Sequence, residues 1–157
     1  MDDNVPIARR TGDDDELDFD VLVSLVGYHL RRAQVAVFND FAGQMAGEQI
    51  TPGQFGVIAL IGANPGLTQS ALARAVGIER STMVAVIDAL ESRGIVERRA
   101  SPVDRRSYAL VLTDTGQEML ARLKPMVADH EARIGGGLTD DERRQLIRLL
   151  KKLADGV

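Results

Sequence analysis

The most constraining feature of this sequence is a pair of strand-like segments separated by a short charged stretch. Residues 108–112 alternate larger and smaller apolar side chains, which is the pattern of a half-buried strand. Residues 94–99 are the expected partner strand, and the residues between the two have the composition of a turn. Arg105 and Arg106 at the tip are placed to reach a nucleic acid, and Asp104 to pair with a neighbouring arginine. The segment therefore predicts a β-hairpin with a rigid, positively charged tip.

Two helices are predicted immediately before this hairpin. The first covers about residues 68–78, with Thr68 as a hydroxyl N-cap and Gly77 able to take the left-handed conformation that ends a helix. The second covers about residues 81–93, has apolar residues at core-facing spacing, and ends at Gly94. Two helices joined by a tight turn form a DNA-reading unit, in which the second helix enters the major groove. The hairpin that follows them has the position of a wing.

Long helices are predicted on both sides of this unit. One continuous helix is expected over about residues 18–47, because its apolar side chains form a stripe, and a helix that begins at Thr51-Pro52 follows it. After the hairpin, a helix should begin at Asp114 or Thr115, bend at Pro125 and end at about Ile134. Three consecutive glycines then break the chain before a last helix, for which Thr139 and Glu142 form a capping box.

The expected fold class is mainly α (α+β): a winged helix-turn-helix with long N- and C-terminal dimerisation helices. Residues 1–16 are acidic and polar and predict a flexible arm, and residues 17–157 predict a single domain. Within that domain the winged unit covers about 50–116, and the dimerisation helices cover about 18–47 and 115–155. These helices carry more apolar surface than a small winged unit covers, which indicates a subunit interface. The alternative is that they complete the core of a monomer.

Several short motifs occur in an order that is typical of one protein family. They are Gln69 with Leu72-Ala73, residues 90–98 (LESRGIVER), residues 104–106 (DRR), Leu112-Thr113 and Gly116. In this order and spacing, from about Asp18 to the C-terminus, the chain resembles the MarR family of winged helix-turn-helix transcription regulators. It is similar to the branch that controls the degradation of aromatic acids and hydroxycinnamates. The resemblance implies a homodimeric repressor that presents two recognition helices to a pseudo-palindromic site on double-stranded DNA.

The residues predicted to contact DNA lie in the two reading helices and the wing. Ser81, Thr82 and Ala85 face away from the apolar side of the second helix, so base contacts are open to them. Many family members have Thr-Arg where this chain has Val84-Ala85. This difference predicts fewer direct contacts to base edges and more dependence on the wing and on DNA shape. The DNA-binding candidates are Thr68, Gln69, Arg74, Arg80, Ser81, Thr82, Ala85, Arg98, Arg99, Arg105 and Arg106, with Asp104 stabilising the wing.

The net charge of −4 is unusual for a DNA-binding protein. The acidic residues gather near the chain ends, in 13–20 and 140–142, whereas arginines gather at the wing. Local potential decides binding, and charges beyond about 8 Å are screened at physiological salt. The alternative is a ligand-independent or a protein-interaction winged-helix module, and the acidic total suits binding to another protein. A salt titration distinguishes the two, because phosphate neutralisation makes affinity fall steeply with salt.

A second set of candidates indicates a binding site for a small effector. Tyr28, Arg31 and Arg32, next to His29, lie about one helical turn apart, so they are placed to bind an aromatic ring and an anion. The family resemblance places effectors between the dimer helices and the winged unit, which makes Phe55 and Ile58 candidate apolar walls. An aromatic acid or an aryl-coenzyme A thioester is the expected ligand. The alternative is that the two arginines are solvated or pair with Asp40 or Glu48.

Composition excludes several other classes of protein. The chain has no cysteine and only two histidines, so no cofactor or metal is expected, although carboxylates from a second subunit leave one route to a metal site open. No glycine-rich phosphate loop, histidine-carboxylate motif or serine elbow is present, so the chain is predicted not to be an enzyme. No segment resembles a signal peptide or a membrane span, which predicts a cytoplasmic protein without a membrane partner.

Overall fold

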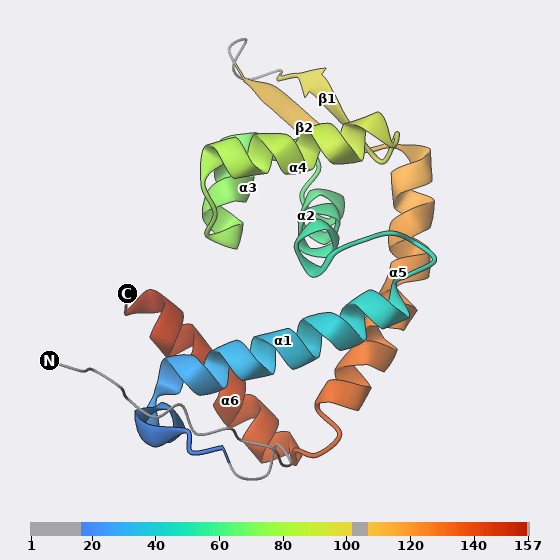
Figure 1. Ribbon diagram of the computed structural model, residues 1–157. Helices are drawn as coiled ribbons and strands as arrows, with labels where there is room; N and C mark the ends of the chain where they lie inside the picture. Colours follow the sequence, from blue (N-terminus) through green and yellow to red (C-terminus); the bar gives the residue numbers. More distant parts are fainter. Residues whose placement is uncertain (1–16, 102–106, 157) are drawn as a thin grey trace, which may run out of the picture. The chain divides into compact units, whose positions relative to one another are not determined.

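The computed structural model of the protein describes residues 17–101 and 107–156, and its contacts divide the chain into two compact units, Met1–Val35 and Ala36–Val157. Helix α1 crosses the boundary between the units. In chain order the elements are η2 (Asp20–Ser24), α1 (Val26–Gln44), α2 (Pro52–Ala63), α3 (Gln69–Val76), α4 (Arg80–Ser92), β1 (Val96–Ala100), β2 (Tyr108–Leu112), α5 (Asp114–Ile134) and α6 (Asp140–Asp155) (Figure 1). The mainly α winged helix-turn-helix fold expected from the sequence is confirmed.

The expectation of one continuous helix over 18–47 is wrong at both ends. Asp20–Ser24 form a separate 3-10 turn, and Leu25 is extended, so α1 begins only at Val26. This break is stabilised locally, because Nε2 of His29 donates a hydrogen bond to the carbonyl oxygen of Val23 at 2.9 Å. The carbonyl oxygen of Val23 therefore has a hydrogen-bond partner although no helical backbone bond continues past it. At the other end, α1 stops at Gln44.

The helix-turn-helix forms as its capping residues predict. The hydroxyl of Thr51 and the side chain of Gln54 make a capping box at the start of α2. Thr68 caps α3 by accepting a hydrogen bond from the backbone N–H of Ala71 at 3.2 Å, and Gly77 ends α3 at φ 71. Only glycine adopts that left-handed backbone without a steric penalty. The chain therefore turns sharply into α4, which lies beside α3 at the base of the hairpin (Figure 1).

The wing is the two-stranded antiparallel sheet of β1 and β2, in which Val96 pairs with Leu112 and Ala100 with Tyr108. An isolated bridge between Leu67 and Leu110 joins β2 to the segment before α3. Ala109, Leu110 and Leu112 of β2 are buried, so the strand is anchored in the core of the reading unit. The predicted tip residues Asp104, Arg105 and Arg106 lie outside the described residues.

The core of the second unit lies where α2, α3, α4, the wing and α5 meet. Burying a leucine, isoleucine or methionine side chain stabilises a fold by about 1.5–3 kcal/mol. The side chains with at most 1% of their surface exposed include Ile58, Ile61, Leu72, Met83, Ile87, Leu90, Ile95, Leu110 and Leu123. They come from α2, α3, α4, β2 and α5 and from the segment before β1, so packing of the buried face of α4 orients the reading helix.

Helix α5 begins against this core and α6 follows it. Helix α5 begins at Asp114, as expected, and the hydroxyl of Thr113 caps it by accepting from the backbone N–H of Gly116 at 3.0 Å. The helix is continuous through Pro125, and the capping box of Thr139 and Glu142 at the start of α6 is confirmed. None of the residues of α6, all of which the structure describes, is buried. Its five large aliphatic side chains stay 40–49% exposed.

Candidate nucleic-acid interface

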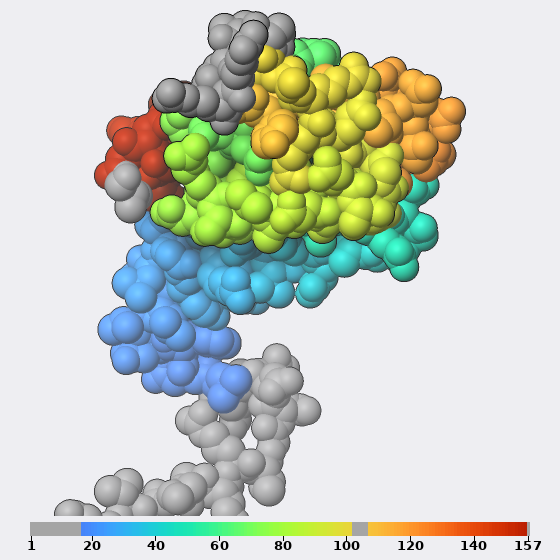
Figure 2. Space-filling view, turned by 90° about the horizontal axis from the view of Figure 1, so that it is seen from above, coloured from blue at the N-terminus to red at the C-terminus, as the bar shows by residue number. Residues whose placement is uncertain are grey.

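The recognition helix α4 has one buried and one exposed face. Met83, Ile87 and Leu90 are completely buried, and they hold the helix on the core. Ser81, Thr82 and Ala85 are exposed on the opposite side, as the sequence predicts. Figure 2 shows α4 and the β1–β2 hairpin side by side on one face of the second unit. Polar groups at the start of a helix beside a wing form a surface that fits the major groove and its phosphates.

Three cationic or polar candidates flank this surface in α3 and at the start of α4. A guanidinium nitrogen of Arg80 donates to the hydroxyl oxygen of Ser70 at 2.5 Å, which links the two reading helices. Arg74 is exposed, and its side chain makes no hydrogen bond or ion pair with another described residue. Thr68 is half-buried and its hydroxyl already caps α3. Of the three, Arg74 is the side chain that the structure leaves open to phosphate.

Arg98 lies in the middle of β1 and is paired with other groups of the protein. Its guanidinium donates to Asp88 at 2.6 Å and to Glu91, and its side chain is only 17% exposed. Its Nε donates to Oε1 of Gln69 at 3.4 Å, and its backbone N–H donates to Glu91 at 3.2 Å. Burial disfavours the charged form, but the bonds and charges of Asp88 and Glu91 outweigh it and raise the pKa of Arg98 above its usual range.

This network changes the roles predicted for Arg98 and Gln69. A guanidinium that neutralises two carboxylates has little charge left for DNA, so Arg98 stabilises the position of the wing against α4. The Gln69 side chain is used in the same cluster, and its Nε2 atom is buried without a hydrogen-bond partner among the described residues. Farther along β1, exposed Arg99 forms an ion pair with Glu97. The predicted contacts of Arg105 and Arg106 remain predictions.

The predicted effector residues of the first unit form a small cluster on α1. The guanidinium of Arg32 lies 5.7 Å from the ring centroid of Tyr28, which is the cation–π contact expected for residues four apart. The rings of Phe19 and His29 lie 6.2 Å and 5.3 Å from the same ring. Arg31 contacts only the side-chain oxygen of Gln34, at 3.4 Å, among the described residues. The cluster therefore combines aromatic surface with two exposed cations.

The acidic residues proposed as alternative partners of these arginines have other partners in the second unit. Asp40 accepts hydrogen bonds from His130 at 2.6 Å and from Arg133 at 2.9 Å, and Glu48 accepts from Arg122 at 3.2 Å. The pKa of Asp40 is lowered to about 2, mainly by the hydrogen bond from Arg133 and next by that from His130. His130 is thus a structural histidine, with only 2% of its surface exposed.

The two predicted apolar walls of an effector pocket differ in exposure. Phe55 is half-buried and its ring lies 6.4 Å from that of Phe41. Ile58 has no exposed surface, because it is packed in the core of the reading unit. A ligand cannot contact a side chain that is already enclosed on all sides, so the expectation for Ile58 is not met in this conformation.

Comparison with known proteins identifies the family of this chain. Residues 48–107 match the family model described as "MarR family". A putative transcriptional regulatory protein for the hcr operon of Thauera aromatica is 44% identical over 129 residues, which are 82% of this chain and 78% of that protein. The chain belongs to the MarR family. The resemblance inferred from the motifs in residues 69–116 is therefore confirmed.

Two solved structures of another MarR family member match most of the chain. The transcriptional repressor CouR bound to a 23-mer DNA duplex is 47% identical, with a TM-score of 0.83 over 88% of this chain and 99% of that one. CouR bound to p-coumaroyl-CoA is 44% identical, with a TM-score of 0.82 over 88% of this chain and 98% of that one. These relatives are transcriptional regulators, so the prediction that the chain is a DNA-binding regulator and not an enzyme is confirmed.

Several residues of this MarR family member escaped prediction from the sequence. Asp88 and Glu91 lie three apart on α4, and that spacing offered a signal for a shared cation. The pairing of Asp40 with His130 and Arg133 joins residues about 90 apart, and no local pattern reveals it.

Among the described residues, no group of histidines and carboxylates is arranged to hold a metal ion. No helix of the described chain is long and apolar enough to cross a membrane.

Proposed function

We propose that this MarR family regulator is a homodimeric repressor that binds a pseudo-palindromic operator through α4 and the wing. The observation that carries the proposal is the exposed polar start of α4, where Ser81 and Thr82 lie opposite fully buried anchors. A relative that is 47% identical is described in a complex with a DNA duplex. The proposed DNA contacts are made by these hydroxyls, Ala85, Arg74 and Arg80, together with wing residues Arg99, Arg105 and Arg106. Such a regulator must reach the chromosome, so the proposal includes a cytoplasmic location.

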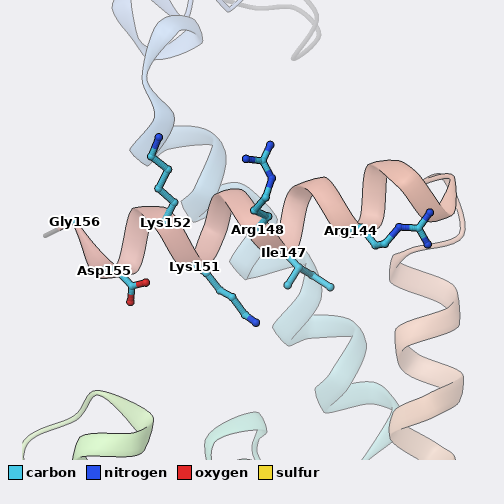
Figure 3. Close-up of a pocket in the computed structure, with 7 residues that line it drawn as sticks. All are labelled: Arg144, Ile147, Arg148, Lys151, Lys152, Asp155 and Gly156. Carbon is cyan, nitrogen blue, oxygen red and sulfur yellow. The ribbon is translucent and has the colours of Figure 1, made fainter.

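The proposed dimer follows from the terminal helices. Five aliphatic side chains of α6 are 40–49% exposed, and the capping box at its start shows that the helix is well formed. Figure 3 shows Arg148 and Lys152 extending from the same side of α6. A helix with an uncovered apolar face and a cationic face is expected to bury the former against another surface. We infer that residues 18–47 and 115–155 form the dimer interface, with the winged unit at about 50–116 carried between them.

The proposed effector is an aromatic acid or its coenzyme A thioester. The Tyr28 ring and the exposed guanidinium groups of Arg31 and Arg32 offer an aromatic surface next to positive charge. The ring suits the aryl group of such a ligand, and the guanidinium groups suit its phosphates or its carboxylate. A relative that is 44% identical is described as bound to p-coumaroyl-CoA. The effector relieves repression if it binds the DNA-free conformation more tightly than the DNA-bound one.

Fluorescence anisotropy with a labelled duplex tests this function. The duplex is first selected by the purified protein from a random library, and its affinity is then measured across a range of salt concentrations. The logarithm of affinity should fall with the logarithm of salt by about 0.9 per phosphate contact. Addition of p-coumaroyl-CoA should release the duplex, whereas coenzyme A alone should not. Failure to select any sequence would contradict the DNA-binding half of the proposal, and an unaffected complex would contradict the effector half.

The effector cluster is tested by replacing both Arg31 and Arg32 with alanine. DNA affinity should stay within about twofold, while release by p-coumaroyl-CoA should require at least roughly tenfold more ligand, because charge-assisted contacts of about 1.5–3 kcal/mol are lost. The matched control is Lys124→Ala, which removes an exposed cation from α5. A double variant that responds to the thioester as the parent does would refute the role given to this cluster.

A further inference from the structure

Arg93, directly after the recognition helix, is an exposed cation that binds protein carbonyls. It is the C-cap residue of α4, and its two terminal guanidinium nitrogens donate to the carbonyl oxygens of Glu48 and Gln49, each at 2.9 Å. These carbonyls belong to the turn between α1 and α2. The end of the recognition helix is thus joined to a segment more than 40 residues earlier in the chain.

The turn that Arg93 binds is held in an unusual conformation. Gln49 has φ 53, in the left-handed region where a side chain is rarely found. The backbone N–H groups of Glu48 and Gln49 both donate to the carbonyl oxygen of Met45, at 3.0 Å. Buried Met45 and Ile50 fix the two ends of the turn in the core. Arg93 therefore binds the carbonyls of two residues whose own N–H groups are already hydrogen-bonded to Met45.

The same turn is also joined to α5. The carboxylate of Glu48 accepts hydrogen bonds from Nε and a terminal nitrogen of Arg122, at 3.2 and 3.4 Å. One residue thus contacts the end of the recognition helix through its carbonyl and α5 through its side chain. The planar guanidinium of arginine presents two separate terminal nitrogens to two neighbouring carbonyls, whereas lysine has only one nitrogen to share between them.

We propose that Arg93 is a positioning residue for DNA recognition, which fixes the angle of α4 by binding the carbonyls of Glu48 and Gln49. Packing restrains the buried face of α4, Arg98 links Asp88 and Glu91 of the helix to β1, and Arg93 restrains its C-terminal end. Loss of this restraint lets the exposed face of α4 shift in the groove, where base contacts depend on register and phosphate contacts much less. Arg93 then determines specificity without touching DNA. The inference depends on the DNA-binding half of the proposed function.

Arg93→Gln and the milder Arg93→Lys test the inference, with affinity measured for the selected duplex and for a scrambled one. We expect the ratio of the two affinities to fall at least roughly fivefold in Arg93→Gln, while the salt slope stays unchanged because no phosphate contact is lost. Arg93→Lys should lie between parent and Arg93→Gln. The matched control is Arg74→Gln, which should weaken both duplexes alike and reduce the salt slope by about 1.

The outcomes distinguish a failure of the role proposed for Arg93 from a failure of the proposed function. An equal loss of affinity for both duplexes in Arg93→Gln, with a smaller salt slope, would show that Arg93 contacts phosphate and would overturn the inference. An unchanged affinity ratio would also overturn it. If the parent selects no sequence, the proposed function fails first and the inference fails with it. The thermal unfolding midpoint of each variant shows whether the fold itself has changed.

Discussion

Gly116 is the position at which the structure makes its sharpest prediction about stability. A Cβ atom built on Gly116 would lie 2.0 Å from the carbonyl oxygen of Ile95 and 3.0 Å from its carbonyl carbon. That oxygen also accepts the backbone N–H of Thr113 at 3.1 Å, so the backbone around it is already fixed. Alanine at this site must push the start of α5 away from the base of the wing by more than about 1 Å, because ordinary contacts begin above about 3 Å.

The cost of Gly116→Ala can be worked out from three contributions. Overpacking a close contact costs about 1–3 kcal/mol, and a weakened hydrogen bond from Thr113 adds about 1 kcal/mol. The higher helix propensity of alanine returns about 1 kcal/mol, which leaves a net loss of about 1–3 kcal/mol. Unfolding in urea, followed by circular dichroism and extrapolated linearly to water, measures this difference.

Gly56→Ala is the matched control for this substitution. Gly56 lies inside α2, and no atom is found within 4 Å of a Cβ built on it, so alanine should stabilise the protein by up to about 1 kcal/mol. Gly62 is intermediate, because its Cβ would meet the flexible end of the Leu120 side chain at 2.6 Å. If Gly116→Ala costs less than about 1 kcal/mol relative to Gly56→Ala, the close approach does not constrain this fold as argued.

Local signals predicted most of the reading unit correctly. Thr51, Thr68 and Thr139 cap the helices that the sequence assigned to them, and Gly77 ends α3 in the left-handed conformation. Capping and glycine conformation depend on residues within one turn, so a single sequence contains the necessary information. The break before α1 was missed because the apolar residues of 18–25 fit a helix equally well. The hydrogen bond from His29 that accompanies the break does not show in that pattern.

The candidate site was predicted less completely than the fold, because arginines were assigned by position and not by partner. The sequence places Arg98 among the cations of the wing, but the structure pairs it with Asp88 and Glu91. Arg93 is not among the predicted site residues, since a single arginine after a helix gives no sign of the carbonyls it binds. Which cation is free for DNA depends on contacts between distant elements. Sequence patterns define the candidates, and burial and pairing then decide among them.

Two further predictions concern assembly and acid stability. Leu150→Lys puts a charge on the exposed apolar face of α6, so sedimentation velocity at micromolar concentration should show monomer in place of the proposed dimer, and an unchanged dimer would exclude this face from the interface. Asp40→Asn removes the carboxylate that accepts hydrogen bonds from Arg133 and His130 and whose pKa is lowered to about 2 from 3.8. A carboxylate with a lowered pKa in the folded state stabilises the fold above the pKa of the unfolded chain, and this contribution is lost as the carboxylate is protonated. The difference in the free energy of unfolding between the parent and Asp40→Asn should therefore be largest at about pH 6, where Asp40 is ionised in both states. This margin should shrink as the pH falls from about 4 to about 2. Urea titrations at several pH values measure it, and a margin that stays constant down to pH 2 would show that ionised Asp40 is not what stabilises the contact between α1 and α5.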